Sequence, residues 1–263
     1  MLKSNAAWNV PIKLERAPAQ TKSRKRFLAV GCSHGQMLDR SAAKALLKFR
    51  DDFKPHKVIH LGDWCDTAAW RSGAKASADE VADVALDIES GLTFLEELEP
   101  TLVFNGNHEH RIWEAAGKPN AIVRQAAIAT IQGIEQFIQG QLKAEYVQDY
   151  VLDKSWRRLG NYLVGHGFFY NTHATLKHAE KMGNCIFAHL HRQEVVRGSR
   201  GDSPTGVCVG YLGQRDKFKY ADRWDSRFRW NAGWCYGEYS DTDCQWQLQR
   251  FQQPETKPEY KSV

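Results

Sequence analysis

In the stretch 102–111, LVFNGNHEHR, an apolar run is followed by residue types that are able to bind metal ions and transfer protons. The run stops at Gly106, and Asn107, His108 and Arg111 stand just beyond it. Amide oxygens and imidazole nitrogens are metal ligands, and histidine titrates near neutral pH. This composition at the end of a short apolar segment indicates a chemical site.

Other short apolar segments end in the same way. The groups that follow them are Cys32 and His34 after residues 27–30, Asp63 after 58–61, His166 after 162–164, and His189 with His191 after 186–187. In open α/β sheets, sites form at the carboxyl ends of the strands, so these groups are expected to converge. A carboxylate, an amide and several imidazoles together suggest two divalent metal ions bridged by Asp63, about 3.5–4 Å apart, as in phosphoryl transfer.

The elements that must position these groups are buried strands and amphipathic helices. Each apolar segment has the pattern of a strand buried on both faces of a parallel sheet. Helices are expected over residues 41–50, 78–99, 120–138 and 172–182, the second of them begun by a capping box of Ser77 and Glu80. Strands at Glu194–Val196, Val207–Val209, Trp234–Glu238 and Gln245–Gln249 are expected to form a second, partly antiparallel sheet.

Length and composition indicate one globular domain. The 263 residues are 42% hydrophobic and 25% charged, and the formal net charge of +5 mildly favours phosphate-bearing partners. We expect a basic arm at 1–25, the domain at 26–251 and a polar tail at 252–263. The six cysteines form no CxxC pair and are expected to be reduced. The sequence shows no signal peptide and no membrane span, which predicts a cytoplasmic protein without a membrane partner.

The ordered motifs resemble those of the calcineurin-like metallophosphoesterases, most of all bacterial and phage-borne members. The matching positions are Cys32 and His34, Gly62-Asp63-Trp64-Cys65-Asp66, Gly106-Asn107-His108-Glu109, His166, and Ala188-His189-Leu190-His191. The match spans most of residues 27–191. The resemblance implies an α/β fold, a four-layer α/β/β/α sandwich of two mixed sheets flanked by helices. It also implies a phosphoester substrate and two divalent ions, with manganese, zinc or iron expected.

The resemblance further implies a role for each matching residue. Cys32, His34 and His191 would bind the first ion, Asp63 would bridge, and Asn107, His166 and His189 would bind the second. His108 would protonate the leaving group and would be oriented by Asp66. Independently of the family, Arg111 is a candidate phosphate clamp, because guanidinium groups bind phosphate oxygens in pairs.

The chain departs from the family pattern at Cys32, where the family has aspartate. A thiolate ligand favours softer ions such as zinc or iron over magnesium. The alternative is a small buried cysteine beside a weakened site, which would leave a metal-binding interaction protein without catalysis. Thr67 replaces the arginine of the protein-phosphatase branch, which argues against a phosphoprotein substrate. Ala188 replaces a glycine, and we expect this exchange to be tolerated.

Other residues have a structural interpretation. His60 is expected to be a packed histidine, and His173 and His178 to be structural or solvated. Cys65 is a weak candidate for a redox switch with Cys32. Residues 197–230 mix arginine and lysine with aromatic side chains, a composition that suits single-stranded nucleic acid or a twisted edge with shielded charges. A nuclease acting on DNA or RNA is therefore the alternative to a general phosphoesterase.

Overall fold

Two mixed β-sheets pack face to face in the computed structural model, which describes residues 24–76, 78–218, 221 and 228–252. The first sheet has the strand order β11-β10-β1-β2-β3-β4. Its members are β1 (Lys25–Val30), β2 (Lys57–His60), β3 (Leu102–Phe104), β4 (Glu145–Val147), β10 (Ala232–Tyr239) and β11 (Cys244–Phe251). The strands from β1 to β4 are parallel to their neighbours, whereas β10 and β11 pair antiparallel.

The second sheet has the order β5-β6-β7-β9-β8. Its strands are β5 (Trp156–Leu159), β6 (Tyr162–Gly165), β7 (Cys185–Phe187), β8 (Gln193–Arg197) and β9 (Thr205–Val209). The strands β6, β7 and β9 are parallel, and β5 and β8 pair antiparallel at the edges. The parallel strands of both sheets end next to loops that carry the predicted ligands.

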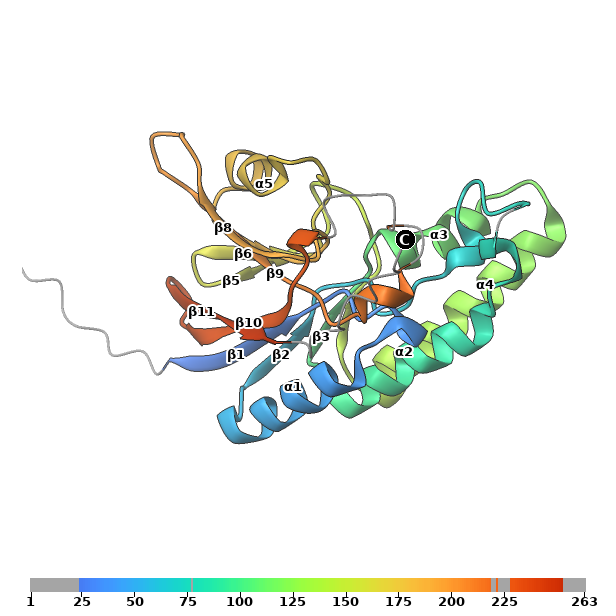
Figure 1. Cartoon of the computed structure of the whole chain (residues 1–263), viewed down its shortest axis with the longest axis horizontal. Coiled ribbons are helices and arrows are strands. Elements are labelled where there is room, and N and C mark those ends of the chain that lie inside the picture. Colours follow the sequence, from blue (N-terminus) through green and yellow to red (C-terminus); the bar gives the residue numbers. More distant parts are fainter. Residues whose placement is uncertain (1–23, 77, 219–220, 222–227, 253–263) are drawn as a thin grey trace, which may run out of the picture.

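Helices cover the outer faces of the two sheets. The helices are α1 (Arg40–Phe53), α2 (Val84–Leu98), α3 (Asn107–Ala116), α4 (Ala121–Glu135), which continues as the π-helical turn Gln136–Gln141, and α5 (Ala174–Met182). Figure 1 shows α1 and α2 below the first sheet and α5 above the second. The expected fold of two mixed sheets flanked by helices is confirmed. No helix in the described ranges has the length and apolarity needed to cross a membrane.

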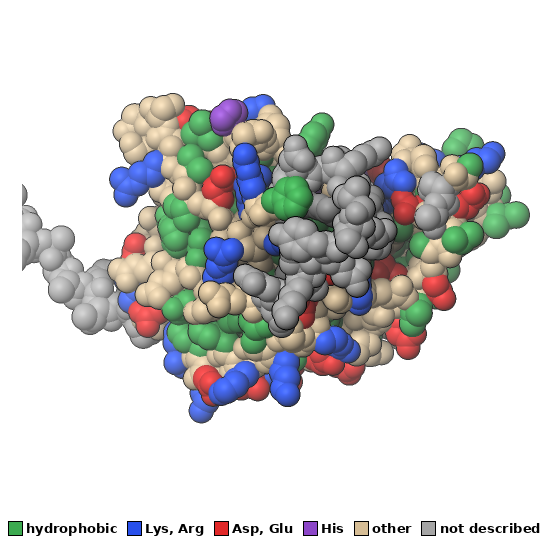
Figure 2. Space-filling view, viewed as in Figure 1, with side chains coloured by type: hydrophobic (Ala, Val, Ile, Leu, Met, Phe, Trp, Pro, Cys, Tyr) green, Lys and Arg blue, Asp and Glu red, His purple; other side chains and the backbone are tan. Residues whose placement is uncertain are grey.

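The outer helical layer faces solvent with charges of both signs. In Figure 2, Lys and Arg side chains are interspersed with Asp and Glu along the lower edge, where α1 and α2 lie. Lys48 pairs with Asp52 at 2.7 Å, and Arg40 reaches across to Glu97 at 3.0 Å. The inner face of α1 is apolar instead, with Ala42, Ala43 and Leu46 buried. The alternation follows the 3.6-residue period of an amphipathic helix.

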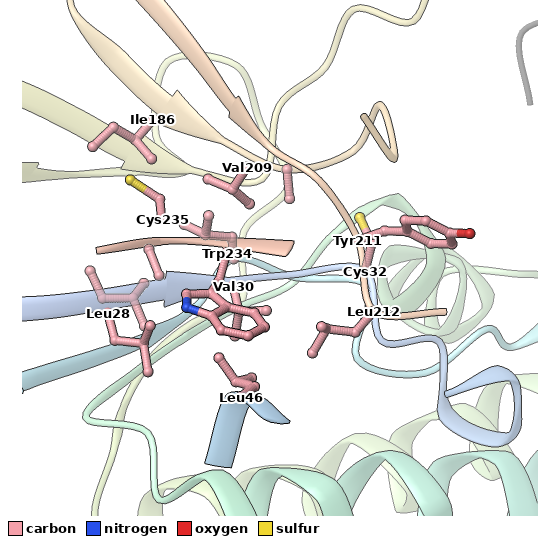
Figure 3. Packing of buried hydrophobic residues seen from close by; sticks show 14 of the residues in the cluster. Leu28, Val30, Cys32, Leu46, Ile186, Val209, Tyr211, Leu212, Trp234 and Cys235 are labelled. Carbon is pink, nitrogen blue, oxygen red and sulfur yellow. The ribbon is translucent and has the colours of Figure 1, made fainter. Parts of the chain in front are cut away.

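The core lies between the sheets and under α1. Figure 3 shows Ile186 and Val209 of the second sheet facing Cys235 of β10, with Leu28 and Leu46 on the other side of the first sheet. These side chains are buried and belong to one cluster. Their burial fixes the distance between the two sheets, and therefore the distance between the loops at the strand ends.

The strands β10 and β11 belong to the first sheet, so their assignment to the second sheet was wrong. β10 pairs with the edge of β1, with Phe27 opposite Gly237 and Leu28 opposite Tyr236. The alternation of buried and exposed residues specifies a strand and its inner face. It does not specify which sheet edge the strand joins.

The second helix begins later than predicted. α2 starts at Val84, and the Asp83 side chain accepts the Leu86 N–H at 3.0 Å as its N-cap. Residues 78–81 form a separate 3₁₀ turn, and Ser77 of the predicted capping box lies outside the described residues. Asp83 caps the helix because its carboxylate accepts a free N–H group of the first turn.

The proposed domain boundaries stay a prediction. β1 begins at Lys25, the last residue of the predicted arm, and Arg24 pairs with Asp243 at 2.7 Å. The rest of the arm and residues 253–263 of the tail lie outside the described residues.

Candidate metal centre

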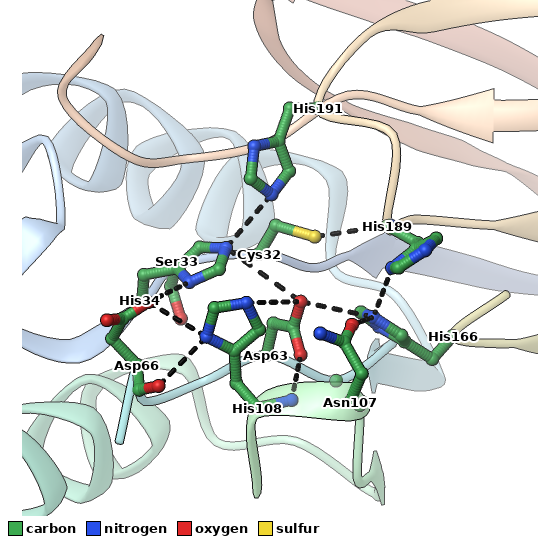
Figure 4. Close-up of polar contacts among 12 residues, drawn as sticks. Cys32, Ser33, His34, Asp63, Asp66, Asn107, His108, His166, His189 and His191 are labelled. Atoms are coloured by element: carbon green, nitrogen blue, oxygen red, sulfur yellow. Dashed lines mark hydrogen bonds and ion pairs between the residues drawn. The ribbon is translucent and has the colours of Figure 1, made fainter. Parts of the chain in front are cut away.

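The predicted ligands converge where the strand ends of the two sheets meet (Figure 4). Loops after β1 and β2 and the first turn of α3 bring Cys32, His34, Asp63 and Asn107 from the side of the first sheet. Loops after β6 and β7 bring His166, His189 and His191 from the side of the second. Two sets of groups that could hold a metal ion share Asp63.

The first set consists of Cys32, His34, Asp63 and His191, whose ligand atoms all lie within 4.8 Å of one another. The Nε2 atoms of His34 and His191 are 3.0 Å apart. The Asp63 Oδ2 atom lies 3.9 Å from His34 Nε2. Burial lowers the pKa of His34, and burial, followed by the neighbouring His34 ring, lowers that of His191. Both rings are therefore held in the neutral form that binds metal ions.

The second set consists of Asp63, His166 and His189, with Asn107 beside it. His166 Nε2 lies 3.1 Å from Asp63 Oδ2, 3.2 Å from Asn107 Oδ1 and 3.2 Å from His189 Nδ1. Burial, followed by the neighbouring His166, lowers the pKa of His189 to about 3. Burial alone would raise the pKa of Asp63, but His166 and His108 lower it well below its usual value.

The hydrogen-bond pattern of His166 fits a cation at this point. Its Nδ1 atom donates to the Leu61 carbonyl at 2.8 Å, so the neutral ring presents a lone pair at Nε2. That lone pair faces the oxygens of Asp63 and Asn107. A cation among these atoms would replace the repulsion between their lone pairs by metal–ligand bonds. The Nδ1 atom of His166 would stay bonded to the Leu61 carbonyl, as in many histidines that bind metal ions.

Asp66 joins His34 to His108 next to the two sets. Its Oδ1 atom lies 3.2 Å from His34 Nδ1 and 2.8 Å from His108 Nδ1. His108 Nδ1 also donates to the Asp66 backbone carbonyl at 2.8 Å. Asp66 therefore orients both rings and leaves their Nε2 atoms facing the site. Burial alone would lower the pKa of His108, but the charge of Asp63 next to it raises the pKa above its usual value. A raised pKa favours the imidazolium form, which can donate a proton.

The backbone at the candidate ligands is strained. The φ angles are 55° at Cys32, 54° at His34, 54° at Asp63, 67° at His189 and 57° at His191. This left-handed region is unfavourable for residues with a Cβ atom and persists where surrounding contacts enforce it. Such strain clusters at functional sites. The loops thus adopt a strained backbone conformation at the residues whose side chains enter the site.

Glycines let the loops approach one another. A Cβ atom on Gly106 would collide with Asp63 Oδ1, so only glycine fits where α3 begins. A Cβ atom on Gly31 would lie 2.7 Å from the Ala188 Cβ. Gly31 therefore provides the space for Ala188, which agrees with the expectation that this alanine is tolerated.

Two buried carboxylates that the sequence did not assign support the site. Glu109 Oε2 accepts the N–H groups of Asp63 at 2.9 Å and Gly106 at 2.7 Å, and its Oε1 accepts that of Cys65 at 2.9 Å. Burial, followed by the charge of Asp63, raises the pKa of Glu109 to about 7. The sequence signal for Glu109 is its position three residues after Gly106, as in a capping box.

Asp87 is the other supporting carboxylate. Its Oδ2 atom accepts the N–H groups of Asp66 at 2.7 Å and Thr67 at 2.8 Å, and its Oδ1 atom accepts that of Gln36 at 3.2 Å. Burial raises the pKa of Asp87. The sequence signal for Asp87 is that it is an acidic residue directly before Ile88, which lies on the apolar face of α2. Asp87 thereby ties α2 to the loops that hold His34 and Asp66.

The structure also places the residues with a structural interpretation. His60 is fully buried, and its Nε2 lies 3.1 Å from Ser33 Oγ, which confirms the packed role. His178 is buried in α5, whereas His173 is exposed at its start. Cys65 lies 3.5 Å from Glu109 Oε1 and packs in a different core cluster from Cys32. The redox hypothesis stays a prediction.

A pocket of about 630 Å³ opens over the two sets of ligands. Asp63, Asn107, His108, His189 and His191 form part of its wall, together with Arg111, Tyr170 and Trp230. Arg111 Nη1 donates to the Asp66 carbonyl at 2.7 Å, and no carboxylate of the described residues forms an ion pair with it. The structure thus brings Arg111 to the pocket with the ligands.

The basic and aromatic segment 197–230 is described only in part. Arg200 pairs with Asp202 at 2.8 Å, and Arg215 donates to the Trp230 carbonyl at 2.8 Å. Residues 219–220 and 222–227 lie outside the described residues. The nucleic-acid hypothesis for this segment stays a prediction.

Comparison with known proteins identifies the family. The profile of the calcineurin-like phosphoesterases matches residues 25–220. The Gene 54 protein of Mycobacterium phage D29 is 27% identical over 192 residues, which cover 65% of this chain and 71% of the phage protein. The Gene 54 protein of Mycobacterium phage L5 is 26% identical over 187 residues, with the same shares.

A solved metallophosphoesterase from Sphaerobacter thermophilus is loosely similar, with 16% identity and a TM-score of 0.41. The similarity covers 82% of this chain and 84% of that one. The family assignment depends on the profile match, which extends over most of the chain and includes every candidate ligand. The chain therefore belongs to the calcineurin-like phosphoesterase family.

Proposed function

We propose that this protein is a metal-dependent phosphoesterase that hydrolyses phosphomonoesters or phosphodiesters. The observation that carries the proposal is the position of Asp63, whose carboxylate lies between two sets of histidines at the wall of an open pocket. Cys32, His34 and His191 would hold one divalent ion, and Asn107, His166 and His189 the other. Manganese, zinc and iron suit these nitrogen, oxygen and sulfur ligands.

Bound divalent ions supply Lewis acidity, which lowers the pKa of water and neutralises charge on a phosphate group. The protein supplies the geometry. Asp63 fixes the two sets of ligands to each other, and the Leu61 carbonyl fixes the ring of His166.

His108 is placed to act as the general acid. Asp66 holds its Nδ1 atom at 2.8 Å, which directs Nε2 toward the pocket, 3.9 Å from Asp63 Oδ2. An imidazolium in this position would donate its Nε2 proton to the departing oxygen of the ester. Arg111, held at the same loop by the Asp66 carbonyl, would bind a phosphate oxygen.

The proposal is tested with two phosphodiesters that differ in their leaving group. Nitrophenolate departs without a proton, whereas an alkoxide needs one. With manganese added, Asp63→Asn should nearly abolish hydrolysis of both esters. His108→Gln should lower kcat about 10²- to 10⁴-fold for the alkyl ester and much less for the nitrophenyl ester. Steady-state rates of the purified variants measure both effects.

His173→Gln is the matched control, because His173 is exposed at the start of α5 and should keep the wild-type rate. Wild-type rates in both site variants would refute the proposal. Equal losses on both esters in His108→Gln would remove its role as the acid. A wild type that binds metal and cleaves neither ester would be the weakened interaction protein, and cleavage of oligonucleotides alone would identify a nuclease.

A further inference from the structure

The two sets of ligands differ in chemical character. The set with Cys32 offers a sulfur, two imidazole nitrogens and one carboxylate oxygen. The set with Asn107 offers an amide oxygen and a carboxylate oxygen beside two imidazole nitrogens. Thiolate and imidazole select zinc-class ions, whereas added oxygen ligands suit manganese or magnesium.

Cys32 packs in the core cluster between the sheets, and its sulfur also lies among the ligand atoms of the site. Its ligand atom lies within 4.8 Å of those of His34, Asp63 and His191. The His189 backbone N–H donates to Cys32 Sγ at 3.2 Å, as Figure 4 shows. This N–H group favours a thiolate, but burial and the charge of Asp63 raise the pKa of the Cys32 thiol, so a bound cation would have to displace the proton. Among the cysteines of the described chain, Cys32 is the one whose sulfur belongs to such a set.

The two positions also differ in exposure. All four residues of the set with Cys32 are buried, although Asp63 and His191 also line the pocket, whereas Asn107 and His189 are partly exposed in its wall. The position with Cys32 therefore lies at the closed side of the site. The position with Asn107 lies where substrate and solvent arrive.

We infer that the metal pair is unlike: a zinc-class ion bound tightly through the Cys32 thiolate on the closed side, and a harder, exchangeable ion such as manganese at Asn107. The inference depends on the proposed metal centre and goes beyond it, because it assigns a different chemical class to each position. Brief treatment with a chelator should remove the ion at Asn107 and leave the zinc at Cys32.

X-ray absorption at the zinc edge tests the inference on the wild-type protein without substrate. Zinc bound at Cys32 should show one sulfur neighbour at about 2.3 Å together with nitrogen or oxygen neighbours at about 2.0–2.2 Å. A spectrum with nitrogen and oxygen neighbours alone, or a purified protein that retains no zinc after brief chelation, would overturn the inference. This measurement needs no variant and therefore does not depend on the folding of one.

Cobalt provides the second test. One cobalt ion per chain should give a sulfur-to-cobalt charge-transfer band in the near ultraviolet, and Cys32→Asp should remove it. Cys185→Ser is the matched control, because Cys185 is buried in β7 within the core cluster under α5 and should keep the band. Cys32→Asp should also reduce the preference for zinc over manganese at least about 10-fold. A band that persists in Cys32→Asp would contradict the assignment.

These readouts are independent of turnover. A sulfur-bound zinc in a protein that hydrolyses no phosphoester would disprove the proposed function and uphold the zinc-class ion at Cys32. Hydrolysis that depends on Asp63 and His108, in a protein whose zinc has no sulfur neighbour, would uphold the proposed function and disprove the zinc assignment at Cys32.

Discussion

Single carboxylates organise the candidate site. The Asp66 carboxylate accepts from His34 Nδ1, and the Asp66 backbone carbonyl accepts from His108 Nδ1 with the carboxylate beside it, so one residue orients a metal ligand and the candidate acid together. The set of His34, Asp66 and His108 could also hold a cation by distance. We assign it to hydrogen bonding instead, because a carboxylate facing two Nδ1 atoms is the usual arrangement that orients metal-bound and catalytic histidines.

Glu109 provides a prediction at the scale of the residue. Replacing Glu109 by glutamine exchanges one acceptor oxygen for an NH₂ group, which cannot accept the N–H groups of Asp63, Gly106 and Cys65 together. Glu109→Gln should therefore loosen the loop of Asp63 and weaken metal binding about 10- to 100-fold. Competition with a chromophoric chelator measures the affinity.

Glu114→Gln is the control, because Glu114 lies exposed on the same helix. Its affinity for metal should equal that of the wild type. If Glu109→Gln bound metal as tightly as Glu114→Gln, Glu109 would have no part in positioning Asp63.

At the scale of the elements, short loops and helix starts carry the site. α3 begins at Asn107, directly after Gly106, so the candidate ligand and His108 occupy its first turn. Helices α2 and α5 then fix loops from the outside, through Asp87 in α2 and His178 in α5. The helices therefore hold loops as well as cover sheets.

His178 connects α5 to the loop that follows His166. Its Nδ1 atom donates to the Ala174 carbonyl at 2.8 Å, and its Nε2 atom accepts the Phe168 N–H at 2.8 Å. Burial lowers the pKa of His178 from 6.5 to about 4. Protonation of Nε2 would remove the acceptor of this bond.

The lowered pKa predicts a loss of stability in acid. Between pH 6.5 and 4 the unfolded chain binds a proton at His178 that the folded chain excludes. The contribution of neutral His178 to the free energy of unfolding is therefore complete above pH 6.5 and is lost as the pH falls to 4. Its size is about 3 kcal/mol of unfolding free energy. His178→Gln should lose less stability than the wild type between pH 7 and pH 4, by up to that amount.

Denaturant unfolding of the chelated proteins at both pH values measures this difference. The exposed His173 supplies the control, since His173→Gln should keep the wild-type dependence on pH. Equal losses in the wild type and His178→Gln would show that the His178 proton is not linked to folding.

At the scale of the whole molecule, the site lies between the two sheets. Cys32, His34 and Asp63 lie in loops that follow strands of the first sheet. His166 and His191 lie in loops that follow strands of the second. Ions bound to both groups would hold the sheets together at their strand ends. An ion that binds the folded chain alone stabilises it by mass action.

Removal of metal should therefore lower the stability of the whole fold. At an ion concentration 100-fold above Kd, binding adds about 2.7 kcal/mol to the unfolding free energy, which is roughly 5–10 °C in Tm for a chain of this size. Thermal unfolding with and without a chelator should show this shift. Asp63→Asn, which lacks the shared ligand, should show a smaller shift than the wild type, and a wild type without any shift would exclude a metal between the sheets.

The sequence by itself determined the strands of the parallel core, the order of the motifs at their ends and the family that those motifs resemble. These features are local, because a ligand that directly follows a buried strand must lie at that strand's carboxyl end. The tertiary structure decided what depends on residues far apart in the chain. It placed β10 beside β1, directed Glu109 and Asp87 onto distant backbone N–H groups, and set the Cys32 sulfur near His191 from the side of the other sheet. A periodic pattern gives the buried face of an element, whereas the partner of that face follows only from packing the whole chain.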